Sequence, residues 1–183
     1  MLNPNVKFTV QDYMNLPESE DKRYELIEGE LYMVPAPKFA HQIISKKLFR
    51  VIDEFVERGK LGVVAYAPVD VVLSVEDVMQ PDIIYVSSDR ESIITEDNVQ
   101  GAPDLVIEIL SPGTAGRDRT IKRGKYARFG VREYWIVDPQ KRTLEVTTAG
   151  KKGLETVRIY PEGTKAESPL LPGLEVDLSA VFP

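Results

Sequence analysis

The sequence predicts an α/β fold in which helices pack on a mixed β-sheet. Short apolar runs of strand type alternate with two longer segments whose apolar residues recur at helical spacing. The 183 residues are enough for one domain with a hydrophobic core and are few for two. No repeat, low-complexity stretch or linker interrupts the pattern. We therefore expect one domain over residues 1–183, with a central sheet flanked by helices.

Three elements are expected in the first part of the chain. Thr9 is a favoured N-cap residue, and it predicts a short helix over residues 9–14. Residues 24–34 predict a β-hairpin that turns at Gly29. An amphipathic helix is predicted over residues 41–56, because apolar side chains recur there at helical spacing.

The rest of the chain predicts further strands and one more helix. Residues 104–110 are the most apolar run and are expected at the centre of the sheet. Residues 115–129 predict a helix that Gly130 closes as its C-cap, and residues 87–101 predict a polar loop. Further strands are predicted over residues 62–66, 69–73, 82–86 and 133–137, and in a tail of short strands over residues 143–178.

The composition is that of an ordinary globular protein, with 43% hydrophobic and 28% charged residues. Cysteine is absent, which excludes disulfides and thiolate metal sites. Neither a signal peptide nor an apolar stretch long enough to cross a bilayer is visible, so we expect a cytoplasmic protein without membrane contact. The net charge of −6 argues against a protein that coats nucleic acid, but a basic strip over residues 117–128 is compatible with a nuclease.

Two acidic residues in apolar, strand-like runs are the first candidates for a functional site. Glu108 lies in the middle of its run, where burial of a carboxylate is costly unless a partner offsets it. Asp104 shares its face but lies roughly 13 Å away along the strand, so Asp104 and Glu108 cannot bind one ion. Asp82, which follows Pro81 where another strand begins, is the natural partner, and such carboxylates suit Mg²⁺ or Mn²⁺. The alternative is that Asp82 and Asp104 bond loop backbone at the entry of their strands.

One lysine of the second helix is predicted to face the sheet. Lys122, Tyr126 and Phe129 follow at i, i+4 and i+7, so they share one helical face. If both rings pack on the sheet, Lys122 is carried inward and reaches a strand carboxylate or a scissile phosphate. The alternatives are that Lys122 extends to solvent, or that Lys125 on a neighbouring row takes its place.

The hairpin and the first long helix supply further candidates. His41 is the only histidine, and it is either a general base or a helix residue bonded to a nearby group. A single histidine cannot build a histidine-rich zinc site. Glu25, Glu28 and Glu30 flank the hairpin, and the sequence does not choose which of them reaches the site; we name Glu30 as the candidate.

Several motifs along the chain combine into one pattern. They are RYELIEGEL (23–31), His41, QPD (80–82), GAPDLVIEILSP (101–112), the segment 118–126, GVREYWIVDP (130–139) and SPLLPGL (168–174). In this combination nearly the whole chain resembles the Uma family of restriction endonucleases, which is placed in the PD-(D/E)XK nuclease superfamily. The resemblance implies a restriction-endonuclease-like core, a mixed sheet flanked by helices with a divalent metal ion at its carboxylates.

The resemblance also implies roles for individual residues. Pro81-Asp82 matches the PD element of the superfamily, and Glu108 matches its second acid. The superfamily lysine would stand two residues after that acid, where this chain has Leu110. The resemblance implies that the lysine has moved to the following helix, at the position of Lys122.

We therefore expect a Mg²⁺-dependent endonuclease that hydrolyses phosphodiester bonds in DNA, with Mn²⁺ as a possible substitute. Asp82 and Glu108 would hold the ion. Lys122 would position the attacking water or stabilise charge on the phosphate. His41 or Glu30 would complete the site.

Arg119 and Arg123 are the candidates for contact with DNA, and a homodimer is the expected assembly. Two other functions compete with this hypothesis. One is a binding module with a degenerate site that docks nucleic acid or protein without cutting, which the acidic net charge and the absence of a lysine two residues after Glu108 favour. The other is a metal-free hydrolase that uses two carboxylates on sugars, although the apolar surroundings argue against it.

Overall fold

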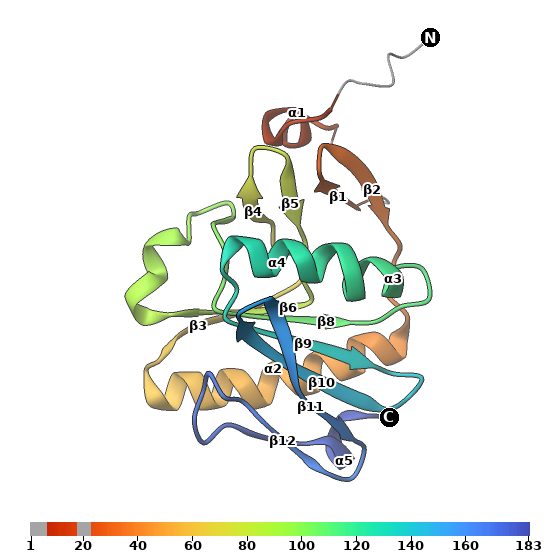
Figure 1. The fold of residues 1–183 in the computed structure, drawn as a ribbon, viewed down its shortest axis with the longest axis vertical. Coiled ribbons are helices and arrows are strands. Elements are labelled where there is room, and N and C mark those ends of the chain that lie inside the picture. The colour runs from red at the N-terminus through yellow and green to blue at the C-terminus, as the bar shows by residue number, and fades with distance from the viewer. Residues whose placement is uncertain (1–6, 18–22) are drawn as a thin grey trace.

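The structure is a computed structural model that describes residues 7–17 and 23–183. Its main feature is a mixed six-stranded sheet with helices on both faces, and Figure 1 shows α4 above this sheet and α2 below it. Strands β8 and β9 run parallel, and the other neighbouring strands are antiparallel. In order across the sheet, the strands are β11 (Gly153–Pro161), β10 (Thr143–Gly150), β9 (Glu133–Asp138), β8 (Leu105–Ile109), β6 (Ile83–Ser87) and β3 (Gly62–Tyr66).

The helices form the outer layers. Helix α2 (Phe39–Gly59) precedes β3, and three helical pieces connect β8 with β9. These pieces are α3 (Ala115–Arg117), a π turn η2 (Asp118–Lys122) and α4 (Arg123–Phe129). Because β8 and β9 are parallel, their connection must cross back over the sheet, and this crossover places α4 on one face of it. No helix in the described part of the chain is long and apolar enough to cross a membrane.

A second, mixed sheet contributes to the α4 side of the molecule. Buried residues of its strands share one hydrophobic cluster with Tyr126 of α4 and Val106 of β8. Its strands, in order, are β2 (Glu30–Val34), β1 (Arg23–Ile27), β5 (Asp77–Met79), β4 (Val71–Ser74) and β7 (Val99–Gln100). The remaining elements are α1 (Val10–Met14), the 3₁₀ helix η1 (Ser88–Ile93), the pair β12 (Lys165–Glu167) and β13 (Glu175–Asp177), and α5 (Leu178–Val181).

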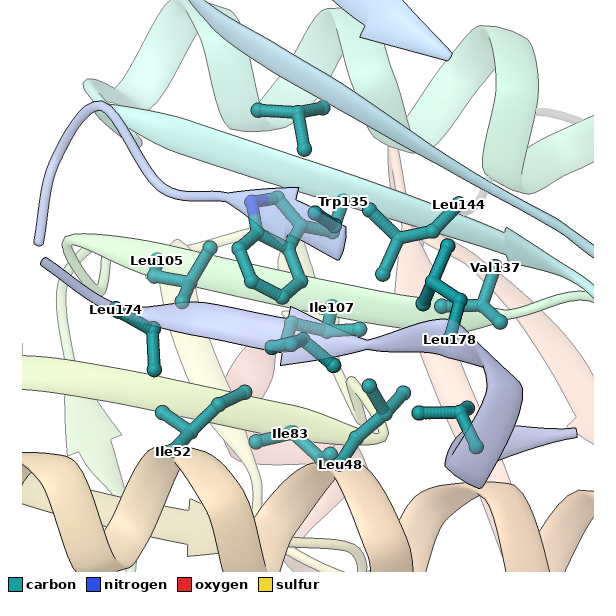
Figure 2. Close-up of a cluster of buried hydrophobic side chains, with 14 of the residues drawn as sticks. Leu48, Ile52, Ile83, Leu105, Ile107, Trp135, Val137, Leu144, Leu174 and Leu178 are labelled. Carbon is teal, nitrogen blue, oxygen red and sulfur yellow. The ribbon is translucent and has the colours of Figure 1, made fainter. Parts of the chain in front are cut away.

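Alternation along β8 divides the hydrophobic core in two. Odd-numbered residues of this strand belong to the cluster against α2, and even-numbered residues belong to the cluster against α4. On the α2 side, Trp135 from β9 lies among aliphatic side chains of neighbouring strands and of helices α2 and α5 (Figure 2). Full burial of each aliphatic side chain stabilises the fold by about 1.5–3 kcal/mol. The labelled members of this cluster include Leu48, Ile52, Ile83, Leu105, Ile107 and Leu178.

The mixed sheet, the flanking helices and the inner position of β8 confirm the sequence prediction. The hairpin also forms as predicted, with Glu28 and Gly29 in left-handed conformations at its turn. The short N-terminal helix has the predicted cap, because the side chain of Thr9 accepts a hydrogen bond from the backbone of Asp12. Local patterns of this kind predict structure well because the residues that determine them lie close together in the sequence.

Several boundaries differ from those predicted. Helix α2 begins at Phe39, so His41 lies within its first turn, and the helix ends only where Lys60 adopts a left-handed conformation. Strand β6 begins at Ile83, so Asp82 precedes the strand. Strand β5 was not predicted, since its three residues are too few for an alternating pattern. The predicted helix over residues 115–129 contains the π turn, which helical spacing did not reveal.

Candidate active site

Glu108 occupies the α4 side of β8, where its charge lies beneath the crossover helix. Its neighbours of the same parity, Val106 and Leu110, belong to the hydrophobic cluster against α4. The side chain of Glu108 is only 5% exposed. The hydroxyl of Tyr126 donates a hydrogen bond of 2.8 Å to its Oε1, and Lys122 Nζ lies 3.0 Å from the same atom. The inward face predicted for Lys122 and Tyr126 is therefore present.

Lys122 lies at the centre of a group of carboxylates. Its Nζ is 2.7 Å from Glu25 Oε1, 3.0 Å from Glu108 Oε1 and 3.4 Å from Asp118 Oδ1. All four side chains are at most 5% exposed. We call Glu25, Glu108, Asp118 and Lys122 the buried ionic cluster. Three carboxylates share one ammonium group, so the buried ionic cluster carries an excess of negative charge when all its groups are ionised.

The π turn brings Asp118 and Lys122 into this cluster from one short segment. Both residues lie within η2, and both are buried. The hydroxyl of Tyr134 donates a hydrogen bond of 3.0 Å to the backbone carbonyl of Asp118, which anchors the turn to β9. Isolated π turns within helices are frequently found at functional sites. Asp118 Oδ1 is buried and accepts no hydrogen bond among the described residues.

The electrostatics of the cluster follow from burial and crowding. Burial raises the pKa of Glu108 well above its ordinary value, with Lys122 opposing this effect and neighbouring carboxylates reinforcing it. Burial likewise raises the pKa of Asp118. Burial disfavours the charged form of Lys122, but the carboxylates around it outweigh this penalty and raise its pKa well above the ordinary value. The ammonium group therefore stays protonated at neutral pH.

Asp82 lies beside this cluster at the start of β6. Ile83 pairs with Ile107, so the same register places Asp82 opposite Glu108. Asp82 Oδ2 accepts a hydrogen bond of 2.7 Å from the backbone N–H of Ile109. It also lies 3.3 Å from His41 Nε2, which α2 supplies from the other side of the sheet.

His41 is held by this contact. Burial alone would lower the pKa of His41, but the hydrogen bond and the charge of Asp82 raise it above the ordinary value. The other ring nitrogen, Nδ1, is buried without a hydrogen-bond partner among the described residues. The sequence analysis predicted one site that contains Asp82, Glu108, Lys122 and His41. The structure places these four residues at the same end of β8 and β6.

Glu30 does not join the other predicted site residues. It is an exposed residue of β2, and it accepts a hydrogen bond from the hydroxyl of Tyr32. Glu25 is the hairpin glutamate that enters the cluster, where it also accepts a hydrogen bond of 2.9 Å from the backbone N–H of Gln80. The sequence contains a signal that favours Glu25. Side chains two residues apart on a strand point to the same face, and Ile27, two residues after Glu25, belongs to the hydrophobic cluster against α4.

Asp118 was the other residue that sequence reasoning missed. It stands one helical turn before Lys122, at i and i+4, so its spacing alone placed it on the inward face. Asp104, in contrast, is a structural residue. It is fully buried at the start of β8 and accepts hydrogen bonds from Ser87 and Arg90.

The two arginines predicted to contact DNA are paired with carboxylates. Arg119 contacts Asp138 and Glu145, at 3.0 and 3.2 Å. Arg123 contacts Glu145 at 3.2 Å and donates to the backbone carbonyl of Leu154. These residues connect the crossover helix to β9, β10 and β11, and the corresponding carboxylates neutralise their charge.

Lys125, the substitute for Lys122, lies in a separate ion pair. Its Nζ is 3.0 Å from Asp77 Oδ1 and 3.2 Å from Glu28 Oε1. The side chain is 9% exposed and ties α4 to the two hairpin turns of the second sheet. Lys125 therefore has no direct contact with Glu108, and Lys122 is the lysine of this cluster.

The donor set fits a hard divalent cation. Mg²⁺ commonly binds through one or two carboxylates and keeps several waters, which the opposed pair Asp82 and Glu108 can provide. Among residues 7–17 and 23–183, no three His, Asp or Glu side chains converge as a preformed metal site. The Lys122 ammonium instead lies among the carboxylates. A further cation would neutralise the excess negative charge, including that near Asp118 Oδ1, which accepts no hydrogen bond among the described residues and lies 3.4 Å from Lys122 Nζ.

Fold and site together define a protein of restriction-endonuclease-like fold, in which Glu108 of β8 lies opposite Asp82, just before the neighbouring strand β6. A solved protein from Anabaena variabilis ATCC 29413, described as "a putative nuclease belonging to DUF820", superposes with a TM-score of 0.80. The superposition covers 96% of this chain and 97% of that one, at 23% sequence identity. This likeness shows that the two proteins share a fold.

The family model described as "Uma2: Putative restriction endonuclease" matches residues 10–179, and the chain belongs to this family. A curated relative, the "Uncharacterized protein slr1290" of Synechocystis, is 23% identical over 124 residues. That match covers 68% of this chain and spans 64% of the length of the relative. Family membership confirms the resemblance on which the sequence prediction relied.

Proposed function

We propose that this protein is a divalent-metal-dependent endonuclease that hydrolyses phosphodiester bonds in DNA. Asp82 and Glu108 would hold Mg²⁺, for which Mn²⁺ would substitute. The ion would polarise the phosphate and lower the pKa of a bound water. The observation that carries the proposal is the opposition of two carboxylates beside a buried lysine and a histidine, in a chain of the Uma2 family.

The protein side chains have separable tasks in this proposal. Tyr126 and the backbone N–H of Ile109 orient the two carboxylates. Lys122 carries a permanent positive charge that would stabilise the charge developing on the phosphate. His41 holds Asp82 in place through Nε2, so we assign it a positioning role.

The position of the lysine favours a second candidate function. Leu110 stands where the superfamily would place its lysine, and every carboxylate contact of Lys122 is already formed in the structure. A module that binds DNA without cutting it is therefore the alternative. We propose DNA as the partner in either case, and a homodimer as the assembly, since paired sites would act on both strands of a duplex.

Cleavage of supercoiled plasmid DNA separates these functions. The wild-type protein should nick or linearise the plasmid in Mg²⁺ or Mn²⁺ and should leave it intact in EDTA. Glu108→Gln and Asp82→Asn should abolish cleavage, whereas Glu30→Gln should not, because Glu30 lies outside the cluster. DNA binding without cleavage in any divalent metal would favour the binding module, and retained cleavage in both cluster variants would contradict the proposed site.

A further inference from the structure

Four basic residues of the crossover segment are already paired within the protein, and the two others, Arg117 and Arg128, lie over the rings of Tyr32 and Phe129. Lys122, Lys125, Arg119 and Arg123 each lie within 3.5 Å of at least one carboxylate. Direct contact of a phosphate with any of these four side chains would require breaking an ion pair. Unpaired basic residues of another element can bind nucleic acid without breaking an ion pair.

Helix α2 supplies such residues in its first half. Residues 38–52 contain four basic side chains and no acidic one, in a chain whose net charge is −6. None of the four forms a salt bridge with another described residue, and three of them are exposed. They are Lys38, Lys46, Lys47 and Arg50.

An exposed aromatic residue lies on the same side of the helix. Phe39, Lys46 and Arg50 stand at i, i+7 and i+11, so they follow one line along α2. This line faces solvent, since the buried residues Leu48 and Ile52 lie on the opposite side of the helix. The side chain of Phe39 is 82% exposed, an unusual position for a large apolar ring. We call Lys38, Phe39, Lys46, Lys47 and Arg50 the α2 ridge.

The α2 ridge begins beside the candidate active site. His41, two residues after Phe39 and on the opposite side of the helix, contacts Asp82. Gly113, which follows β8 and Glu108, lies against Pro35 just before the helix. Figure 1 shows the first turn of α2 at the same end of the sheet as α3. A strand bound along the ridge would therefore approach the carboxylates at its Phe39 end.

We propose that the α2 ridge binds the DNA backbone and guides it toward Asp82 and Glu108, with Phe39 stacking on a base beside the site. This inference rests on the proposed function. Phosphate is favoured over a lipid surface because the apolar stripe of α2 is buried in the core. Within the described part of the chain, Phe39 is then the only large exposed apolar side chain in the first turn of the helix. Aromatic stacking tolerates any base sequence, and unpaired basic side chains track the backbone.

Charge reversal tests the ridge against a matched site. Lys46→Glu/Arg50→Glu changes two exposed residues of the ridge, and Lys151→Glu/Lys152→Glu makes the same change in an exposed turn. That turn follows β10 and lies toward the start of β8, far along the sheet from Glu108. Binding of a fluorescent DNA would be measured against salt in Ca²⁺, which suppresses cutting. The ridge variant should bind at least about tenfold more weakly, with a salt slope smaller by roughly two, and the turn variant should bind like the wild type.

The aromatic contact is tested separately. Phe39→Ala should weaken binding to single-stranded DNA by on the order of tenfold, while Val75→Ala should leave it unchanged. Val75 is a suitable control because it is 73% exposed in the turn between β4 and β5.

Several outcomes would contradict the proposal that the α2 ridge binds DNA. Equal losses in the ridge and turn variants would mean that only total charge matters. Wild-type binding by the ridge variant, in a protein that still cleaves DNA, would reject the ridge and leave the proposed function intact. Binding to phosphatidylserine vesicles that competes with DNA and depends on Phe39 would assign the ridge to a membrane surface. A wild-type protein that neither binds nor cuts DNA would reject the proposed function together with the ridge.

Discussion

Lys122 is the cation around which the buried carboxylates of the site are arranged. It contacts three acidic side chains, two of which come from strands and one from its own π turn. A divalent cation at Asp82 and Glu108 would compete with this ammonium group for Glu108. The same lysine would therefore stabilise the metal-free protein and oppose metal binding.

Replacing Lys122 tests this competition. Lys122→Met should tighten Mn²⁺ binding and abolish DNA cleavage, because it removes both the competing charge and the charge that faces the phosphate. It should also lower the free energy of unfolding without metal by about 3–5 kcal/mol, since it leaves buried carboxylates without their partner. Calorimetric titration and urea unfolding measure these effects. Lys125→Met is the control: it should lower stability without changing Mn²⁺ affinity, and weaker Mn²⁺ binding in Lys122→Met would contradict the competition.

Two hairpin glutamates provide a second comparison between single residues. Glu25→Gln should lower the free energy of unfolding by about 1.5–3 kcal/mol, because it weakens a buried charged contact with Lys122. Glu30→Gln should change it little, since Glu30 is exposed. Urea unfolding of the two variants at neutral pH measures the difference. Equal effects would mean that Glu25 does not support Lys122.

At the scale of elements, the sequence predicted the features that regular local patterns determine. It missed the features that depend on contacts between segments distant in the sequence. The parity of Glu108 and the spacing of Lys122 and Tyr126 predicted their common side of the sheet, because both depend on regular backbone geometry. Helical spacing could not reveal the π turn, which inserts one irregular turn into an otherwise helical segment. The parity of Glu25 with Ile27 favours Glu25 over Glu30, but the packing of this face of β1 against α4 depends on contacts between distant segments.

Glycines in regular elements give a test of the crossover helix. Gly124→Ala should raise the free energy of unfolding by about 0.5–1 kcal/mol, because Gly124 is exposed within α4 and an added Cβ meets no atom within 4 Å. Gly62→Ala should destabilise instead, since a Cβ there would lie 2.1 Å from the carbonyl oxygen of Val86 at a φ of +143°. Thermal unfolding of both variants measures these changes. A loss of stability in Gly124→Ala would mean that α4 is packed differently.

At the scale of the whole molecule, the arrangement of charge matters more than its sum. The sequence located a basic strip on the second helix, but it could not show that carboxylates of β9 and β10 neutralise Arg119 and Arg123. Ion pairs between distant elements depend on the tertiary fold. Unpaired basic residues also lie on α2, which the sequence predicted as an amphipathic helix.

Acid sensitivity gives one prediction for the whole fold. Burial alone would raise the pKa of Asp104, but hydrogen bonds from Ser87 and Arg90 lower it below its ordinary value of 3.8. An acid with a lowered pKa contributes stability above its unfolded-state value, and this stability is lost as pH falls through the folded-state value. Asp104→Asn should therefore destabilise the protein at pH 7, and its difference from wild type should shrink as pH falls below about 3.8. Urea unfolding at pH 7 and pH 3 measures this, and a constant difference would contradict the assignment.

The most direct test of the account is calorimetric titration of the metal-free protein with Mn²⁺, because the central claim is that Asp82 and Glu108 form a cation site. Wild type and Glu30→Gln should bind the ion equally, and Mn²⁺ should raise the melting temperature of both. Asp82→Asn and Glu108→Gln should lose the binding and the shift while remaining folded. Undiminished Mn²⁺ binding in both of these variants would contradict the account.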